Sequence, residues 1–327
     1  MPDHFTRPAA GERIRQLAFL LKNTAAIVGR DRSIIGPWAH SAVYAAVMVS
    51  LFYSGILAIA LGAGSTATLL LLAATLMFFY KFFYYVRQDM AQVWLVTQVA
   101  RGGKAQIREA RARVAGMRRQ AWMLGGFSLL AAYAGARARD ERKGLLGWLI
   151  KLGLLALGEV WDLARHFLVP AVTIDRLSLG EGATRMKALR HGVPETLVGV
   201  FGIDIAAGAA GTLMAPLWCV LVLLAAGAGL LVGDGLPAFH SGQLSELFGD
   251  DAPAWLAGRG FNWFPLLIAV WLGKVAGSLL KRAVDSFKNI YFTLFYLRLT
   301  HATEIAPERR EELEGFLRIE EPTATVD

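Results

Sequence analysis

Residues 40–63 read HSAVYAAVMVSLFYSGILAIALGA and contain no charged side chain. A helix of this length, at a rise of about 1.5 Å per residue, is longer than the roughly 30 Å hydrocarbon core of a bilayer. This stretch therefore predicts a first transmembrane helix. The small residues that follow it, GAGS at 62–65, predict a turn into a second helix that returns through the membrane.

The composition of the whole chain supports the same interpretation. The 327 residues are 55% hydrophobic and 18% charged, whereas soluble domains carry about a quarter charged residues. Long apolar runs, such as residues 69–80 and 217–232, would leave too much apolar surface in water. We therefore predict an all-α fold, a polytopic transmembrane helical bundle.

Six apolar segments are candidates for membrane spans. Residues 121–136 are short and residues 145–172 are interrupted by charges, so this pair either crosses the membrane or forms a re-entrant hairpin. Residues 197–232 predict one long crossing with a kink or break at Pro216. We expect about six spans, near residues 40–63, 66–86, 121–136, 145–172, 197–232 and 263–284, with a further aromatic helix at 287–301.

The distribution of charge predicts the sidedness of the chain. Residues 87–120 carry eight basic and two acidic side chains, and the positive-inside rule places such a block in the cytoplasm. The net charge of +8 lies in such blocks between apolar stretches, so we expect no nucleic-acid partner. We also expect residues 1–38 to be a cytoplasmic amphipathic segment, residues 39–301 the transmembrane domain, 233–262 an external loop, and 302–327 an acidic cytoplasmic tail.

Two segments are predicted to lie as amphipathic helices on the membrane surface. Residues 13–35 and 182–191 have the pattern of amphipathic helices on the cytoplasmic surface, and the basic residues of 101–119 and 182–191 predict contact with anionic lipid headgroups. Residues 1–31 lack the apolar region of a cleavable signal peptide. Six spans with both termini in the cytoplasm satisfy most of the charge evidence.

Four stretches carry a resemblance to a known family. They are residues 21–41 with Gly29-Arg30-Asp31-Arg32, residues 82–86, residues 160–170 with Trp161 and Val169-Pro170, and residues 179–183 through 198–202. In these stretches the chain resembles a bacterial family of multi-helix integral-membrane proteins of unknown function. The resemblance implies a helical bundle in the bacterial inner membrane, and it implies no activity. The chain departs from the family pattern at Arg165 and His166, where apolar residues are usual, and in its longer, more acidic external loop.

Three ionisable residues are expected inside the membrane. Glu159 and Asp204 would lie roughly 10 Å from the cytoplasmic boundary and Lys274 about 14 Å from it. A charge at this depth is costly, so a Glu159–Lys274 or Asp204–Lys274 pair is expected. Such a pair serves either as a structural ion pair, which we favour, or as a proton or ion relay.

A weaker pattern is compatible with a metal. Glu159, Asp162 and His166 follow one another at i, i+3 and i+7 on one face of a helix. Because no second helix offers matching ligands, we expect no metal and no other cofactor. The single cysteine, Cys219, excludes an intrachain disulfide.

Small residues predict where helices approach one another closely. Gly273 and Gly277 form a small-xxx-small motif, and Gly202 and Ala206 form another on the preceding span. We favour packing between these two spans within one chain, and homodimerisation is the alternative.

The sequence contains no nucleophile–base arrangement, Gly-rich phosphate loop, cysteine pair or His-Glu-x-x-His motif. We therefore expect a non-enzymatic membrane protein with a structural, assembly or envelope-maintenance role, with a second copy or another membrane protein as partner. The main alternative is a transporter or channel for an ion, lipid or small solute that uses Glu159, Asp204 and Lys274. An intramembrane enzyme that acts on lipids is a third hypothesis.

Overall fold

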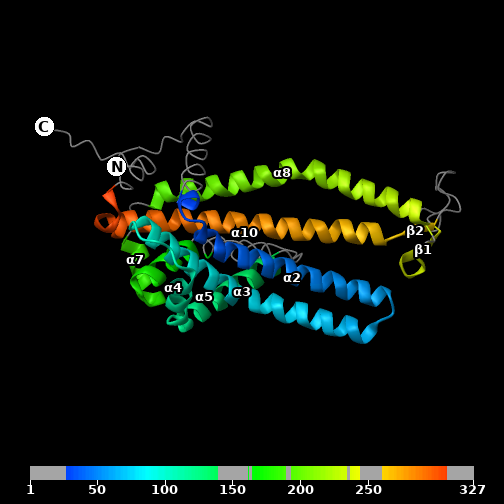
Figure 1. Cartoon of the computed structure of the whole chain (residues 1–327), viewed down its shortest axis with the longest axis horizontal. Helices are drawn as coiled ribbons and strands as arrows, with labels where there is room; N and C mark the ends of the chain where they lie inside the picture. The colour runs from blue at the N-terminus through cyan, green and yellow to red at the C-terminus, as the bar shows by residue number, and fades with distance from the viewer. Residues whose placement is uncertain are drawn as a thin grey trace, which may run out of the picture. The chain divides into compact units, whose positions relative to one another are not determined.

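The computed structural model describes residues 27–138, 161, 164–188, 193–233, 236–243 and 260–307. Most of these residues are α-helical, which confirms the all-α prediction (Figure 1). The elements are η1 (Arg32–Ile34), α2 (Ile35–Ala60), α3 (Gly64–Ala100), α4 (Ile107–Ala115), α5 (Arg118–Ala138), α7 (Leu179–Ala188), α8 (Val193–Val232), η4 (Pro237–Phe239), β1 (His240–Gln243), β2 (Gly260–Asn262), α10 (Phe264–Thr300) and η7 (Ala302–Glu304).

Four helices in the described part of the chain are long and apolar enough to cross a membrane. They cover Arg32–Ala60, Gly64–Ala100, Met214–Val232 and Phe264–Thr300. These segments overlap the spans predicted at 40–63, 66–86, 197–232 and 263–284. Helix α5 covers the predicted span 121–136 but is not among the helices that are long and apolar enough to cross a membrane. Most of 145–172 lies outside the described residues, as do residues 1–26 of the amino-terminal segment and 308–327 of the tail.

The long helices differ from the predicted ones in their bounds. Helix α3 continues from the apolar segment to Ala100, and α10 combines the predicted span 263–284 and its aromatic continuation at 287–301 in one unbroken helix. Helix α8 also continues through Pro216 without a break. A proline removes one hydrogen bond from a helix, and the surrounding turns retain theirs.

Two short strands interrupt the segment that we expected to be a simple loop. Strands β1 and β2 pair antiparallel, with His240 opposite Asn262 and Gln243 opposite Gly260. The side-chain amide of Asn262 donates to the backbone carbonyls of Gly233 and Leu236, at 3.2 and 3.1 Å. These bonds hold the end of α8 beside the start of α10.

The chain divides into two compact units. Unit 1 comprises Met1–Ser41, Lys81–Ala206 and Arg282–Asp327, and unit 2 comprises Ala42–Tyr80 and Ala207–Lys281. Helices α2, α3, α8 and α10 each contribute residues to both units.

Unit 1 has an ordinary buried core. It is formed by the carboxy-terminal parts of α3 and α10, the buried face of α5 and helical residues 164–175. Its largest fully buried side chains include Met90, Leu95, Leu124, Phe292, Phe295 and Tyr296. This part of the chain is folded as a soluble domain is, with apolar groups inside.

Unit 2 differs from unit 1 because many of its large apolar side chains are exposed. Helices α2 and α3 form a hairpin (Figure 1), in which the Tyr44 hydroxyl donates to the Met77 carbonyl at 2.8 Å. The Trp271 indole of α10 donates to the Ser50 hydroxyl of α2 at 3.1 Å. Many large apolar side chains of unit 2 remain exposed, among them Val43, Phe52, Leu69, Leu72, Leu217, Leu223 and Leu231. An apolar surface of this extent is typical of contact with lipid.

Candidate functional site

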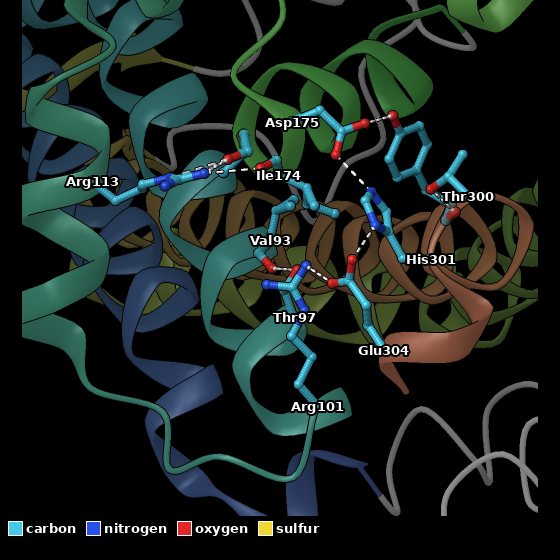
Figure 2. Close-up of polar contacts among 11 residues, drawn as sticks. Val93, Thr97, Arg101, Arg113, Ile174, Asp175, Thr300, His301 and Glu304 are labelled. Carbon is cyan, nitrogen blue, oxygen red and sulfur yellow. Dashed lines mark hydrogen bonds and ion pairs between the residues drawn. The ribbon is translucent and has the colours of Figure 1, made fainter. Parts of the chain in front are cut away.

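Polar side chains in unit 1 form a connected set around Asp175, which we call the Asp175 network (Figure 2). The Tyr296 hydroxyl donates to Asp175 Oδ2 at 2.5 Å, and His301 Nε2 lies 2.7 Å from Asp175 Oδ1. The other ring nitrogen of His301, Nδ1, lies 2.9 Å from Glu304 Oε1. Arg101 forms an ion pair with Glu304. The network therefore joins the ends of α3 and α10 to the end of helical residues 164–175.

Local geometry explains why Asp175 occupies this place. Helical residues end at Asp175, and Arg176 follows with a φ of 57°, in the left-handed region that L-residues rarely adopt. The next helix, α7, begins with a capping box. The Ser178 N–H donates to Glu181 Oε2 at 2.8 Å, and the Glu181 N–H donates to Ser178 Oγ at 3.3 Å. The chain reversal between the two helices leaves the Asp175 carboxylate facing α10.

Arg113 of α4 secures the same helix end. Its guanidinium donates to the carbonyl oxygens of Thr173 and Ile174, at 3.1 and 2.8 Å, and lies 4.3 Å from the centre of the Trp94 ring. Burial lowers the pKa of the Arg113 guanidinium, which nevertheless remains charged because an arginine cannot be deprotonated in a protein. Its charge stabilises the carbonyl end of the helix.

The charges of the Asp175 network are matched to one another. His301 can hydrogen-bond to both carboxylates only when both ring nitrogens carry a proton. The hydrogen bond from His301, and then the nearby charge of Arg101, lower the pKa of the Glu304 carboxyl. The arrangement is a chain of acids and bases that satisfy one another, as in a structural clamp.

A second polar set, the Asp89 network, consists of Asp89, Gln92, Arg165, Arg282 and Ser286. Asp89 of α3 forms an ion pair with Arg165, and Gln92 Nε2 donates to Ser286 Oγ at 2.5 Å. Arg282 pairs with Asp285 one turn further along α10 and lies 4.1 Å from the centre of the Tyr85 ring. The network ties α3 to α10 and to the helix that contains Arg165.

A small cavity lies beside the Asp89 network. It is lined by Pro37, Trp38, Ser41, Gln88, Asp89, Gln92, Arg282 and Ser286, and its volume is about 10 Å³. This is the space of about one water molecule. Trp38 lines this cavity, and its buried indole N–H has no hydrogen-bond partner among the residues that the structure describes. A single water suits this cavity, and an organic substrate does not.

The three residues of the expected intramembrane charge pair are not brought together by the described coordinates. Glu159 lies outside the described residues, and of Asp204 only the helical backbone, within α8, is described. Lys274 lies on α10, and its side chain is exposed. The pairing of these charges stays a prediction.

The structure describes only one residue of the metal-compatible pattern formed by Glu159, Asp162 and His166. Glu159 and Asp162 lie outside the described residues, whereas His166 is buried, with its ring 5.1 Å from that of Phe292. Arg165, the neighbour of His166, forms an ion pair with Asp89 of α3. No group of three His, Cys, Asp or Glu side chains is arranged to hold a metal in the part of the chain that the structure describes.

The small-residue motifs have one visible contact. A Cβ atom added at Gly273 would lie 2.4 Å from the ring of Trp218, so α10 and α8 approach closely at this glycine. Among the described residues nothing lies within 4 Å of a Cβ added at Gly277. Only the backbone of Gly202 and Ala206 is described, and the packing of these two against α10 stays a prediction.

The Asp175 network was not identified from the sequence. Asp175 and His301 are 126 residues apart, and neither belongs to a motif. The one local signal was Ser178 followed by Glu181, a capping-box pattern that marks the start of α7 three residues earlier than the predicted helix 182–191.

Comparison of the chain with protein-family models, with curated proteins and with solved structures finds no match. The function is therefore inferred from the residues and their geometry.

Proposed function

We propose that the chain is an integral protein of the bacterial cytoplasmic membrane with a structural, assembly or envelope-maintenance role. The observation that supports this proposal is the division of the chain into two units, which differ in how much apolar surface they expose. Unit 2 exposes large apolar side chains along its helices, whereas unit 1 encloses an apolar core. This division suits a protein in which lipid-facing helices are joined to a folded unit with a core of its own.

The proposed topology places both termini in the cytoplasm. Helices α2, α3, α8 and α10 make four crossings, and residues 121–136 and 145–172 add either two crossings or none. Both numbers are even, so both return the chain to its original side. The basic block at residues 87–120 then lies in the cytoplasm, as the positive-inside rule requires.

The polar networks support a structural role more than a catalytic one. In the Asp175 and Asp89 networks the charged groups make ion pairs or hydrogen bonds with other protein groups. The cavity beside the Asp89 network has room for about one water molecule. These features favour networks that hold helix ends together, and we propose no reaction for them.

Transport is the second proposal, and Lys274 is the observation that favours it. This lysine is exposed on the part of α10 that belongs to unit 2, within a helix apolar enough to span a membrane. A charge on a spanning helix is costly and often marks a pathway for ions. A relay would combine Lys274 with Asp204 or Glu159.

Flux measurements on proteoliposomes separate the two proposals. Purified wild type, Asp204→Asn and Lys274→Gln would be reconstituted with a pH-sensitive dye and with ion-sensitive dyes inside the vesicles. The structural proposal expects the rate of empty vesicles for all three proteins. A wild-type flux that is lost in Asp204→Asn or Lys274→Gln, and kept in the surface control Lys187→Gln, would instead establish transport.

Crosslinking in intact membranes tests the assembly role directly. A short bifunctional reagent should trap the chain in discrete complexes, with a second copy or with another membrane protein. Migration as a monomer at every reagent concentration, alongside crosslinking of a known membrane oligomer, would argue against that role.

A further inference from the structure

Helix α5 has two faces of different environment. Its buried face contains Ala121, Leu124, Gly125, Ser128, Ala134 and Ala138. Its other face carries five large side chains that are 42% to 63% exposed. We call these five the α5 stripe: Trp122, Met123, Phe127, Leu130 and Tyr133.

The α5 stripe is unusual within unit 1. Apart from Ile35, the large apolar side chains that are exposed in the described part of unit 1 all belong to it. The Trp161 ring lies 5.3 Å from that of Phe127 and the Phe83 ring 4.2 Å from that of Trp122, yet all five side chains of the stripe remain at least 42% exposed. An apolar patch on an otherwise well-packed unit marks a contact surface.

Contacts of α5 indicate that this surface lies at the level of the membrane interface. Trp122 packs on Phe83 of α3, with ring centres 4.2 Å apart. A Cβ added at Gly125 would lie 2.5 Å from a ring carbon of the same Phe83. Phe83 belongs to the aromatic run at residues 78–85, where the apolar part of α3 ends. Aromatic belts of this kind lie at the headgroup level, so α5 is attached there.

The charges next to the α5 stripe identify the chemistry of the partner. Exposed basic residues precede the stripe on the α3–α4 loop, α4 and the first turn of α5, with one exposed acid, Glu109, among them. They are Lys104, Arg108, Arg111, Arg118 and Arg119. An apolar face flanked by basic residues is complementary to a bilayer with anionic headgroups.

We propose that α5 lies in the plane of the cytoplasmic leaflet as an interfacial helix, with the α5 stripe among the upper acyl chains and Arg118 and Arg119 among anionic headgroups. The inference rests on the proposed membrane residence and refines it. It replaces the two arrangements predicted for residues 121–136, a crossing or a re-entrant hairpin, with a helix that lies in the plane of the interface. The occupant of the stripe is lipid.

Site-directed spin labelling of the full chain in nanodiscs tests the depth of α5. Single cysteines would replace Met123, Phe127 and Tyr133 in a Cys219→Ser background, and each label's accessibility to oxygen and to a water-soluble nickel chelate would be measured. An in-plane helix places the three labels at similar shallow depths, with more oxygen than nickel accessibility. A crossing helix would separate the first and last labels by about 15 Å in depth, and this result would overturn the proposal.

Two control positions keep this test separate from the proposed function. A label at Leu72, exposed on α3 in unit 2, should be lipid-accessible, and one at Gln106, exposed in the loop before α4, should be water-accessible. If Leu72 is in lipid while the α5 labels are in water, α5 fails as a lipid contact and membrane residence stands. If the α5 labels are shielded from both reagents, protein covers the stripe and the proposal is wrong. A water-accessible Leu72 would contradict membrane residence itself.

Lipid composition tests the part played by the arginines. In nanodiscs with phosphatidylglycerol, nickel accessibility at Met123→Cys should rise at least about threefold when Arg118 and Arg119 are both replaced by glutamine. The same replacements should change nickel accessibility little in purely zwitterionic nanodiscs. As a control, replacement of an exposed arginine pair on α4, Arg108→Gln with Arg111→Gln, should raise nickel accessibility less than the Arg118 and Arg119 replacements do. If the arginine replacements change nickel accessibility equally in both lipid compositions, anionic headgroups do not bind Arg118 and Arg119, and that part of the proposal is wrong.

Discussion

At the scale of single residues, Asp175 joins segments of unit 1 that lie far apart in the sequence. It receives the Tyr296 hydroxyl and contacts His301, and both partners come from the end of α10 or just beyond it. Its own side chain is largely buried, at 17% exposed. A carboxylate in this position holds two donors that would otherwise lack an acceptor.

Replacement of Asp175 should therefore destabilise unit 1. Asp175→Asn keeps the shape but puts an amide donor against a donor, and we expect a loss of about 2 kcal/mol, since hydrogen bonds to charged groups contribute roughly 1.5–3 kcal/mol. Thermal unfolding in detergent micelles would measure it as a lower Tm. Glu109→Gln, at an exposed position of α4, is the matched control, and an equal effect of the two replacements would contradict this role of Asp175.

Glu304 makes the stability of the Asp175 network depend on pH. The hydrogen bond from His301, followed by the charge of Arg101, lowers the pKa of Glu304 from its ordinary 4.5. The folded chain therefore binds this proton less readily than the unfolded chain. Its contribution is fully present above pH 4.5 and is lost as the pH falls through the lowered pKa.

The pH effect can be measured as the difference in Tm between wild type and Glu304→Gln. The difference should be largest near neutral pH and should shrink in acid below about pH 4.5. Because Glu304 is 46% exposed, solvent screens its interactions and the difference should be small. A difference that stays constant through the acid range would show that the charge of Glu304 contributes nothing.

At the scale of elements, the contact between α5 and α3 depends on a glycine. The Cβ of an alanine at position 125 would lie 3.0 Å from the Cα of Phe83, so the two backbones would have to move apart. Its neighbour Gly126 has no described atom within 4 Å of such a Cβ. The two adjacent glycines are therefore a matched pair for testing the packing.

The two alanine variants should change stability in opposite directions. Gly126→Ala should raise stability by up to about 1 kcal/mol, because alanine is the better helix former. Gly125→Ala gains the same propensity but should lower stability overall, since overpacking a tight contact costs about 1–3 kcal/mol. Thermal unfolding of both variants in the same detergent would measure the difference. Equal stabilisation by both would contradict the close approach of α5 to Phe83.

At the scale of the whole molecule, the proposed topology assigns a side of the membrane to each described turn. The turn at Gly62 and the end of α8 at Gly233 should lie outside the cytoplasm, and the α3–α4 loop at Gly103 should lie inside. Alkaline phosphatase fused at Gly62 or Gly233 should be active, and a fusion at Gly103 inactive. Green fluorescent protein should give the reverse pattern, and activity of the phosphatase at Gly103 would refute the sidedness.

The sequence alone determined the helical class and the segments able to enter a membrane. Residues 40–63 and 66–86 overlap helices α2 and α3, and α10 begins one residue after the predicted start at 263. These properties are readable because the transfer of a helix into lipid is close to a sum over its own side chains. The number of crossings and the charge pair around Lys274 stay predictions.

Only the tertiary structure decided which polar residues meet. Asp175 pairs with His301 across 126 residues, and Arg165 pairs with Asp89 of α3 across 76. Helix α3 also extends beyond its apolar segment because residues 86–100 supply the core of unit 1. Such contacts depend on how several helix ends pack together at once. The sequence of a single segment does not show which residues will pair. Each side chain is polar or apolar by itself, but it becomes buried only when the other segments pack against it.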